Sequence, residues 1–388
     1  MQKKSKLNLI KLSIGALAIK VMSSVSLLMP WNLWIDNIII VLSILVLGIK
    51  MFEMKMKLKK LLVMTFLALF ILVTCVQMKQ YDLLISLIAI YLLMNEDVEV
   101  YISLIYKIQV GMIVIHMALA GLLSLIGYAD QFWIFTGSRF RFNGGFFHPN
   151  VLASYISSCM LMYIWKRFGK ITSNRFAGLL LVIIGSYVLS RSRTNFLINL
   201  LLLFLTIVGQ EKKQFFDKVL NKVLKFLFPV LSIFVYFLQT HYLTGNRWIL
   251  LIDSLLTGRI KYAAYAYWRS GITLWPRFLD YVQSGWVEWN EQWRLNTFAF
   301  DNGYSFIWMQ MGAVWFVIIT ILIWVFVKRV DYKTKIFVLI WIVFAMTEVH
   351  GFNCFKFFPI LLLCFLCSDA KVYRNNVSEE RIAKQKYD

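Results

Sequence analysis

Apolar runs near 20 residues long recur from one end of the sequence to the other, separated by short basic or turn-forming segments. An α-helix needs about 20 apolar residues to cross the hydrocarbon core of a bilayer. The pattern predicts an all-α polytopic membrane protein, with residues 1–388 as a single transmembrane domain. We expect ten to twelve spans, and divide the chain into twelve at about 12–29, 33–49, 61–77, 82–94, 108–127, 150–165, 176–190, 195–210, 226–240, 304–327, 336–349 and 356–367.

The composition agrees with this pattern. Of the 388 residues, 60% are hydrophobic and only 16% are charged, whereas a soluble globular chain has about 25% charged residues. The basic stretch MQKKSKLNLIK precedes the first apolar run, as it would in a signal peptide. However, Lys20 interrupts that run and no small-residue cleavage site follows it, so we expect an uncleaved first span.

Positive charge is unevenly divided between the two sides of the predicted helices. The net charge of +21 could suggest nucleic acid, but 28 of the 41 Lys and Arg residues fall on one set of loops and the two termini. Loops rich in Lys and Arg stay in the cytoplasm. The distribution predicts that both termini are cytoplasmic, that residues 368–388 form a cytoplasmic tail, and that nucleic acid is not a partner.

The opposite, exoplasmic side carries twelve basic residues, and its composition is unusual. Topology requires only positive charge, but nine of these twelve residues are arginines. The planar guanidinium binds phosphate through two parallel hydrogen bonds and stays charged. The alternative is that the arginines only reach toward lipid headgroups. We expect a phosphate-binding outer face formed by Arg139, Arg141, Arg191, Arg193, Arg247, Arg259, Arg269, Arg277 and Arg294.

One exoplasmic loop is long, from about 240 to 303. Its stretches ILLIDSLL, IKYAAYAYWRSGITLW and SGWVEWNEQW predict short amphipathic helices. Long loops with their own structure are usually functional, and we expect this one to cover a cavity between spans. Its tryptophans suit anchoring at the membrane interface or stacking on sugars, and they are Trp275, Trp286, Trp289 and Trp293.

The stretch 139–153, RFRFNGGFFHPNVLA, lies between two apolar runs and has the composition of a tight turn. Gly144 and Gly145 permit backbone angles closed to other residues, and Pro149 fixes one more. We expect Asn150 to cap the following helix. Such a positive turn suits an anion at the membrane surface, although a plain interfacial loop would have similar residues.

Four short motifs follow one another along the predicted outer face. They are R-x-x-G-x-F-x-x-P-N-x-x-A over 141–153, S-R-S at 190–192, T-G-R at 257–259, and D-N-G-Y at 301–304 with Gly312 after it. In order and sidedness these motifs resemble those of bacterial O-antigen polymerases and ligases (Wzy type), over roughly residues 139 to 312. The fourth motif has Asp301 where many members of that family have His.

The resemblance implies a polymerase of O-antigen, capsule or exopolysaccharide in the bacterial plasma membrane. Such an enzyme transfers the growing glycan from undecaprenyl pyrophosphate to the next lipid-linked repeat unit on the outer face. The architecture is similar to the metal-independent members of the GT-C glycosyltransferases, and membrane lipids and a chain-length regulator are expected partners. A ligase that moves a finished glycan to another acceptor, or a flippase of lipid-linked sugars, is the alternative.

This chemistry needs neutralisation of the leaving pyrophosphate, placement of the acceptor hydroxyl and a base. We expect arginines to supply the first, because the predicted loop 30–36 holds only Asp36, without the paired carboxylates of a metal site. We expect no metal and no cofactor. The CxxC pair Cys364 and Cys367 has no His cluster around it and is expected to be buried.

The predicted site residues follow from these requirements. His148 also lies near the outer face, but there a structural or hydrogen-bonding role is favoured over catalysis. The sequence does not decide whether the base is Asp301, Glu348 or His350. The catalytic candidates are Arg141, Arg191, Arg259, Asp301, Glu348 and His350. The substrate-binding candidates are Arg139, Arg193, His148, Asn150, Asn302 and Tyr304.

Overall fold

A computed structural model describes residues 2–29, 33–54, 56–136, 139–211, 213–256 and 258–368. The described residues form two compact units. Unit 1 lies within Met1–Lys57, Ile85–Glu211 and Asn353–Asp388, and unit 2 lies within Leu58–Leu84 and Lys212–Phe352. Both units are mainly helical.

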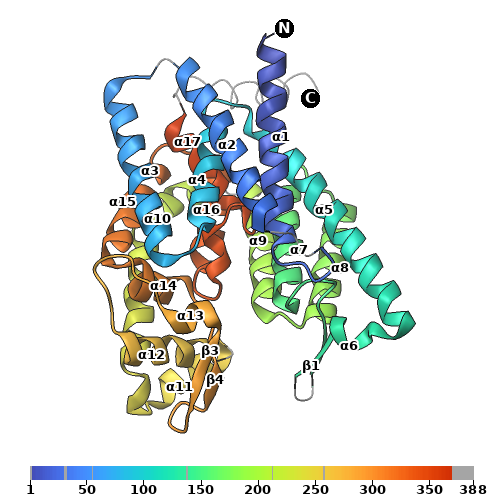
Figure 1. Ribbon diagram of the computed structural model, residues 1–388, viewed down its shortest axis with the longest axis vertical. Helices are drawn as coiled ribbons and strands as arrows, with labels where there is room; N and C mark the ends of the chain where they lie inside the picture. Colours follow the sequence, from blue (N-terminus) through green and yellow to red (C-terminus); the bar gives the residue numbers. More distant parts are fainter. Residues whose placement is uncertain are drawn as a thin grey trace. The chain divides into compact units, whose positions relative to one another are not determined.

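Unit 1 is built around α5 (Val98–Leu123). On one side α5 packs against α1 (Gln2–Ser23), which also contacts α2 (Leu33–Glu53). On another side it packs against α7 (Pro149–Lys166), which contacts α8 (Ser173–Ser190) and α9 (Arg193–Glu211). Figure 1 shows α1 beginning at the same end of this unit as the short α17 (Cys364–Cys367), with the hairpin β1–β2 at the other end.

That hairpin was not predicted. β1 (Trp133–Thr136) pairs antiparallel with β2 (Arg139–Phe142) in the segment that leads into the turn at 143–147. The two turn glycines have left-handed backbones, with φ of 63° at Gly144 and 85° at Gly145. A Cβ on Gly145 would lie 2.6 Å from the Leu28 side chain. The predicted need for glycine in this turn is therefore confirmed.

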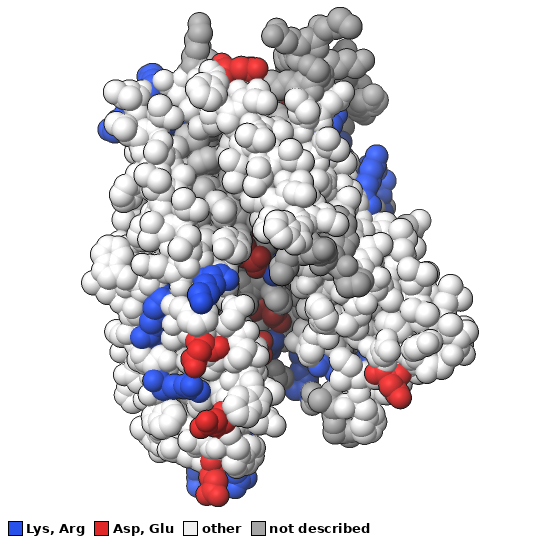
Figure 2. All heavy atoms as spheres, in the orientation of Figure 1, with Lys and Arg blue, Asp and Glu red and all other residues white. Residues whose placement is uncertain are grey.

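Unit 2 contains α3 (Leu58–Met78), α10 (Lys213–Thr240), α15 (Ala313–Val327) and α16 (Tyr332–Phe344). α10 is central, since it contacts α15, α16 and α12 (Arg259–Ser270). Figure 1 shows α11 (Arg247–Leu255), α12 and α13 (Asp280–Ser284) at the end of the unit where α3 and α10 finish. In Figure 2 charged side chains gather over this end, whereas the surface along the middle of α3 is white and therefore carries no charged residues in this view.

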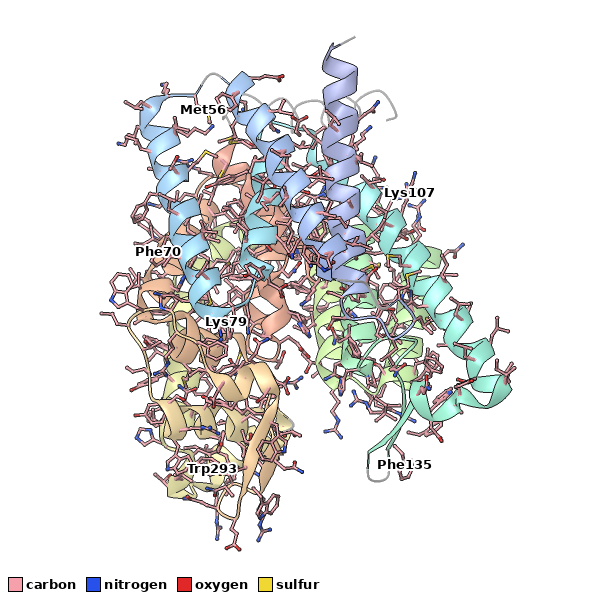
Figure 3. The ribbon with its side chains drawn as sticks, in the orientation of Figure 1. Met56, Phe70, Lys79, Lys107, Phe135 and Trp293 are labelled. Atoms are coloured by element: carbon pink, nitrogen blue, oxygen red, sulfur yellow. The ribbon has the colours of Figure 1, made fainter. Side chains whose placement is uncertain are left out.

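The predicted amphipathic helices of the long loop are confirmed in part. ILLIDSLL lies in α11, and most of IKYAAYAYWRSGITLW forms α12. SGWVEWNEQW is not a helix, because it forms β3 (Trp286–Asn290), which pairs with β4 (Leu295–Thr297). Trp293, labelled in Figure 3, is 1% exposed and packs on other rings, and is not at a free surface. The exposed tryptophans of the loop include Trp275, Trp286 and Trp289.

The span predicted at 304–327 is interrupted. α14 (Gly303–Phe306) passes into a π-helical turn at Ile307–Met311, and α15 starts only after Gly312, whose φ is 95°. The loop closes this break, because Arg277 donates from Nε to the Met309 carbonyl oxygen (2.7 Å) and from its backbone to that of Gln310 (2.9 Å). Irregular backbone at membrane depth needs such partners. The guanidinium of Arg277 therefore holds the loop against this break.

Within the part of the chain that the structure describes, five helices are long and apolar enough to cross a membrane. They are Trp34–Glu53, Leu58–Met78, Val98–Phe132, Ser173–Ser190 and Lys213–Thr240. Shorter apolar helices include Asp82–Leu92, which is α4, Arg193–Gly209, Ala313–Val327 and Phe358–Cys367. The described residues are thus mainly helical with apolar spans, as predicted, although β1–β2 and β3–β4 depart from an all-α chain. The count of twelve spans remains a prediction.

The lysine that interrupts the first apolar run has an acidic partner. Lys20 Nζ lies 3.3 Å from Asp36 Oδ2, and both side chains are largely buried, at 11% and 16% exposed. A charge inside an apolar segment is costly unless it is paired. The pair therefore explains how α1 accommodates Lys20, and it commits Asp36 to the packing of α1 on α2.

Candidate functional site

The densest cluster of predicted site residues lies in unit 2, around an ion pair between Arg259 and Glu348. Arg259 is the first residue of α12, and Glu348 follows the end of α16. Arg259 Nη2 lies 3.0 Å from Glu348 Oε1, and the two side chains are only 7% and 4% exposed. A buried pair of this kind holds its geometry tightly, because separating the charges would leave both desolvated.

The motif D-N-G-Y supplies the second side of this cluster. Asn302 caps α14, because its Oδ1 accepts hydrogen bonds from the backbone N–H groups of Tyr304 (2.9 Å) and Ser305 (3.2 Å). The Tyr304 hydroxyl donates to the carbonyl oxygen of Ile342 in α16 (2.8 Å). Both predicted substrate-binding residues are buried and hold the turn in place. Their hydrogen bonds fix the backbone turn that directly follows Asp301.

Gly303 brings that turn against the residues around Glu348. Its backbone N–H donates to the Ala345 carbonyl oxygen at 2.8 Å. A Cβ here would lie 3.1 Å from that oxygen and 3.3 Å from the carbonyl oxygen of Glu348. A side chain at this position would therefore press on the backbone that carries Glu348.

Asp301 is the more accessible carboxylate of the cluster, since its side chain is half-buried and that of Glu348 is buried. Burial raises the pKa of Asp301 above its usual value, and the positive charge of Arg259 opposes that shift. The pKa of Tyr262, on α12, is also raised, mainly by burial and further by the charge of Asp301. His350 lies on the 3₁₀ turn Val349–Phe352 and is half-buried.

The second group of predicted residues lies in unit 1. Arg141 donates from Nε to the Ser190 carbonyl oxygen (2.7 Å) and from Nη2 to Asn150 Oδ1. The guanidinium thus joins the end of α8 to the first turn of α7. The prediction that Asn150 caps α7 is wrong. His148 is the cap, and its side chain accepts a hydrogen bond from the Asn150 backbone N–H at 3.1 Å.

His148 has a structural role in this turn, since its side chain caps α7. Desolvation by neighbouring atoms and the positive charge of Arg141 lower the pKa of its imidazole. A neutral ring suits a cap, since the nitrogen that accepts the backbone N–H must carry no proton. The imidazole of His148 therefore acts as a hydrogen-bond acceptor near neutral pH.

Two arginines of this group are exposed. Arg191 ends α8 with a left-handed backbone, φ 53°, and Arg193 begins α9, and both side chains are exposed. A left-handed backbone is unusual for arginine. The side chain of Arg139 lies outside the described residues, as does Thr257 of the T-G-R motif.

The structure shows relationships that the sequence did not indicate. The pairing of Arg259 with Glu348 joins residues 89 positions apart, and no local pattern carries that information. The close approach at Gly303 depends on the same tertiary contact. Among the described residues, no group of three or more His, Cys, Asp and Glu side chains could hold a metal ion.

Comparison of the chain with protein-family models, with curated proteins and with solved structures finds no match. The likeness to O-antigen polymerases and ligases thus rests on the four motifs alone. Each of them has a described local role: the glycines and Pro149 shape the turn before α7, Arg191 ends α8 with φ 53°, Gly258 precedes Arg259 with φ 84°, and D-N-G-Y caps α14.

Proposed function

We propose that this chain is a glycosyltransferase of the bacterial plasma membrane that polymerises a cell-surface polysaccharide. Its substrates would be oligosaccharides on undecaprenyl pyrophosphate, and both termini would be cytoplasmic. The observation that carries the proposal is the buried ion pair of Arg259 and Glu348 beside Asp301. Charged groups held in a largely desolvated position are typical of catalytic sites, and the apolar helices fit a lipid-linked substrate.

The three side chains have different roles in this proposal. Arg259 neutralises the charge that develops on the pyrophosphate as the bond from the anomeric carbon to its oxygen breaks. Asp301 accepts the proton of the acceptor hydroxyl as the oxygen of that hydroxyl bonds to the same carbon. The electron pair leaves with undecaprenyl pyrophosphate. Glu348 does not act as the base, because its carboxylate is held by Arg259, and it positions that guanidinium.

The exposed arginines of unit 1 suit a second role in binding lipid pyrophosphate. Arg191 and Arg193 flank the turn between α8 and α9 and have exposed guanidinium groups. Each hydrogen-bonded contact between arginine and phosphate contributes about 1.5–3 kcal/mol. Loss of one such contact would lower the rate by roughly tenfold to a hundredfold. A polymerase handles two lipid-linked substrates, so more than one phosphate-binding group is expected.

The experiment is deletion of the gene, followed by expression of the wild-type chain or of variants at equal level. The size of surface polysaccharide and of lipid-linked sugar is then measured. With Arg259→Ala we expect single repeat units in place of long chains. The matched control is Arg269→Ala, on the same helix. Arg269 was among the arginines expected to bind phosphate, but its guanidinium donates to the Tyr265 hydroxyl (3.0 Å) and lies 3.7 Å from Asp280, so in this proposal it does not bind substrate. We expect long chains with this control.

Other outcomes would identify the alternatives. If deletion leaves long chains that remain on the carrier lipid, the chain is a ligase. If single units accumulate only on the inner leaflet, it is a flippase. If deletion changes neither polymer length nor the lipid-linked pool, the proposal is wrong.

A further inference from the structure

The start of α12 is held by a residue outside that helix. The first four N–H groups of an α-helix have no acceptor within the helix, and a polar side chain just before the helix usually supplies one. Here the preceding residue is Gly258, which has no side chain and a left-handed backbone. The start of α12, where Arg259 stands, therefore needs an acceptor from elsewhere in the chain.

Asp253, on α11, provides that acceptor. Its Oδ1 accepts the backbone N–H of Ile260 at 2.8 Å and that of Lys261 at 3.0 Å. Its Oδ2 accepts the Tyr242 hydroxyl at 3.3 Å, and its residue surface is 8% exposed. A carboxylate at this point also interacts favourably with the positive end of the helix dipole.

The helix that carries Asp253, α11, is held in place by its neighbours. One turn earlier on α11, Ile249 is 4% exposed and packs with Leu238 of α10 and Ile260 of α12 in one apolar cluster. The opposite side of α11 is exposed, with Trp248 and Leu255 at 73% and 69%. Asp253 thus lies on the inner side of a helix that is anchored on both neighbours, so its carboxylate has a defined position.

We propose that Asp253 is a positioning residue for Arg259. By binding the N–H groups of the two residues that follow Arg259, its carboxylate fixes the backbone from which the guanidinium extends toward Glu348. The inference rests on the reaction assigned above to Arg259. Displacement of a catalytic group by about 1 Å lowers a rate by roughly a hundredfold, so loss of this support should reduce turnover while Arg259 is still present.

The first test measures hydrogen exchange of the backbone amides of Ile260 and Lys261 in the full chain in detergent. In Asp253→Ala these two amides lose their acceptor and should exchange on the order of tenfold faster. In Asp253→Asn they should stay protected, because the amide oxygen can accept the same two hydrogen bonds. Ser254→Ala is the control, since Ser254 is exposed and its hydroxyl bonds Leu251 within α11. Unchanged protection in Asp253→Ala would overturn the proposal.

The second test measures turnover with lipid-linked repeat units at saturating concentration. We expect Asp253→Ala to lose roughly tenfold to a hundredfold and Asp253→Asn to restore most of that loss. If Asp253→Ala exchanges faster but turns over as the wild type does, Asp253 does not position Arg259. If the wild-type chain itself shows no turnover, the proposed function fails, and the exchange result still decides whether Asp253 holds the start of α12.

Discussion

Arg259 Nη2 and Glu348 Oε1 lie 3.0 Å apart in the interior of unit 2, although 89 residues separate them in the sequence. The pair fixes the start of α12 against the turn that follows α16. Removing one partner of a buried pair leaves the other charge desolvated, which is more costly than losing a surface contact. The pair can therefore be tested for stability as well as for function.

The stability of this pair should show strong coupling between its members. We expect Arg259→Met or Glu348→Leu alone to reduce the free energy of unfolding by about 3–5 kcal/mol, and the double variant to lose clearly less than the sum. The matched pair Arg269–Asp280, with atoms 3.7 Å apart at the surface, should contribute only about 0–1 kcal/mol. Unfolding in mixed micelles measures the free-energy losses at both ion pairs. If the losses of Arg259→Met and Glu348→Leu simply add in the double variant, the two side chains do not interact.

Gly303 should tolerate no side chain. In Gly303→Ala the new Cβ would press on the carbonyl oxygens of Ala345 and Glu348, and we expect a loss of about 1–3 kcal/mol in the free energy of unfolding. Polymer length should fall with it, because Asp301 moves away from Arg259. The control is Gly185→Ala in α8, where a Cβ meets nothing within 4 Å. A neutral Gly303→Ala would show that the two turns do not touch.

Asp301 should make stability depend on pH. Its pKa in the folded chain is raised, mainly by burial, so the folded state favours the protonated form. The contribution of Asp301 to stability is then full below the pKa of an unfolded aspartate, about 3.9, and decreases as the pH rises through the folded value. Asp301→Asn should therefore raise the melting temperature near neutral pH.

The gain from Asp301→Asn should shrink as the pH falls toward about 3, where the wild-type carboxyl is protonated in both states. Melting temperatures of the wild type and the variant across this range give the test. An equal difference at all pH values would mean that Asp301 titrates normally.

We expect Arg191 to lower the stability of the fold while contributing to substrate binding. Its left-handed backbone, φ 53°, disfavours residues with a Cβ by about 1–2 kcal/mol relative to glycine. Arg191→Gly should therefore raise the melting temperature and, because the guanidinium is lost, also reduce polymer length. Arg193→Gly, a helical position next to it, should lower stability. If Arg191→Gly gives normal polymer, Arg191 does not bind substrate.

Local features of the site were accessible from the sequence. Gly144 and Gly145 lie in a turn with the predicted backbone, and the D-N-G-Y motif opens a helix as expected. His148 and Asn150 show the limit of this reasoning. Asparagine is a favoured cap residue and histidine is not. The cap is nevertheless His148, because Pro149 occupies the first helical position, where its missing N–H has no effect.

Contacts between distant segments were not accessible. Apolar periodicity predicted one helix over 304–327, but Gly312 breaks it where the 271–277 segment supplies hydrogen bonds. The alternation in SGWVEWNEQW supports a strand as well as a helix, and pairing with β4 decides it. Asp253 gave no signal, because its role depends on the fold of α11 against α12.

The most direct measurement uses purified chain in lipid bilayers with undecaprenyl-pyrophosphate-linked repeat units and records the chain lengths formed. We predict that the wild type forms a ladder of polymers and that Asp301→Asn, folded at least as stably, leaves single units. The exposed-site control Arg269→Ala should form the wild-type ladder. Single units with the wild type, or a normal ladder with Asp301→Asn, would contradict the account.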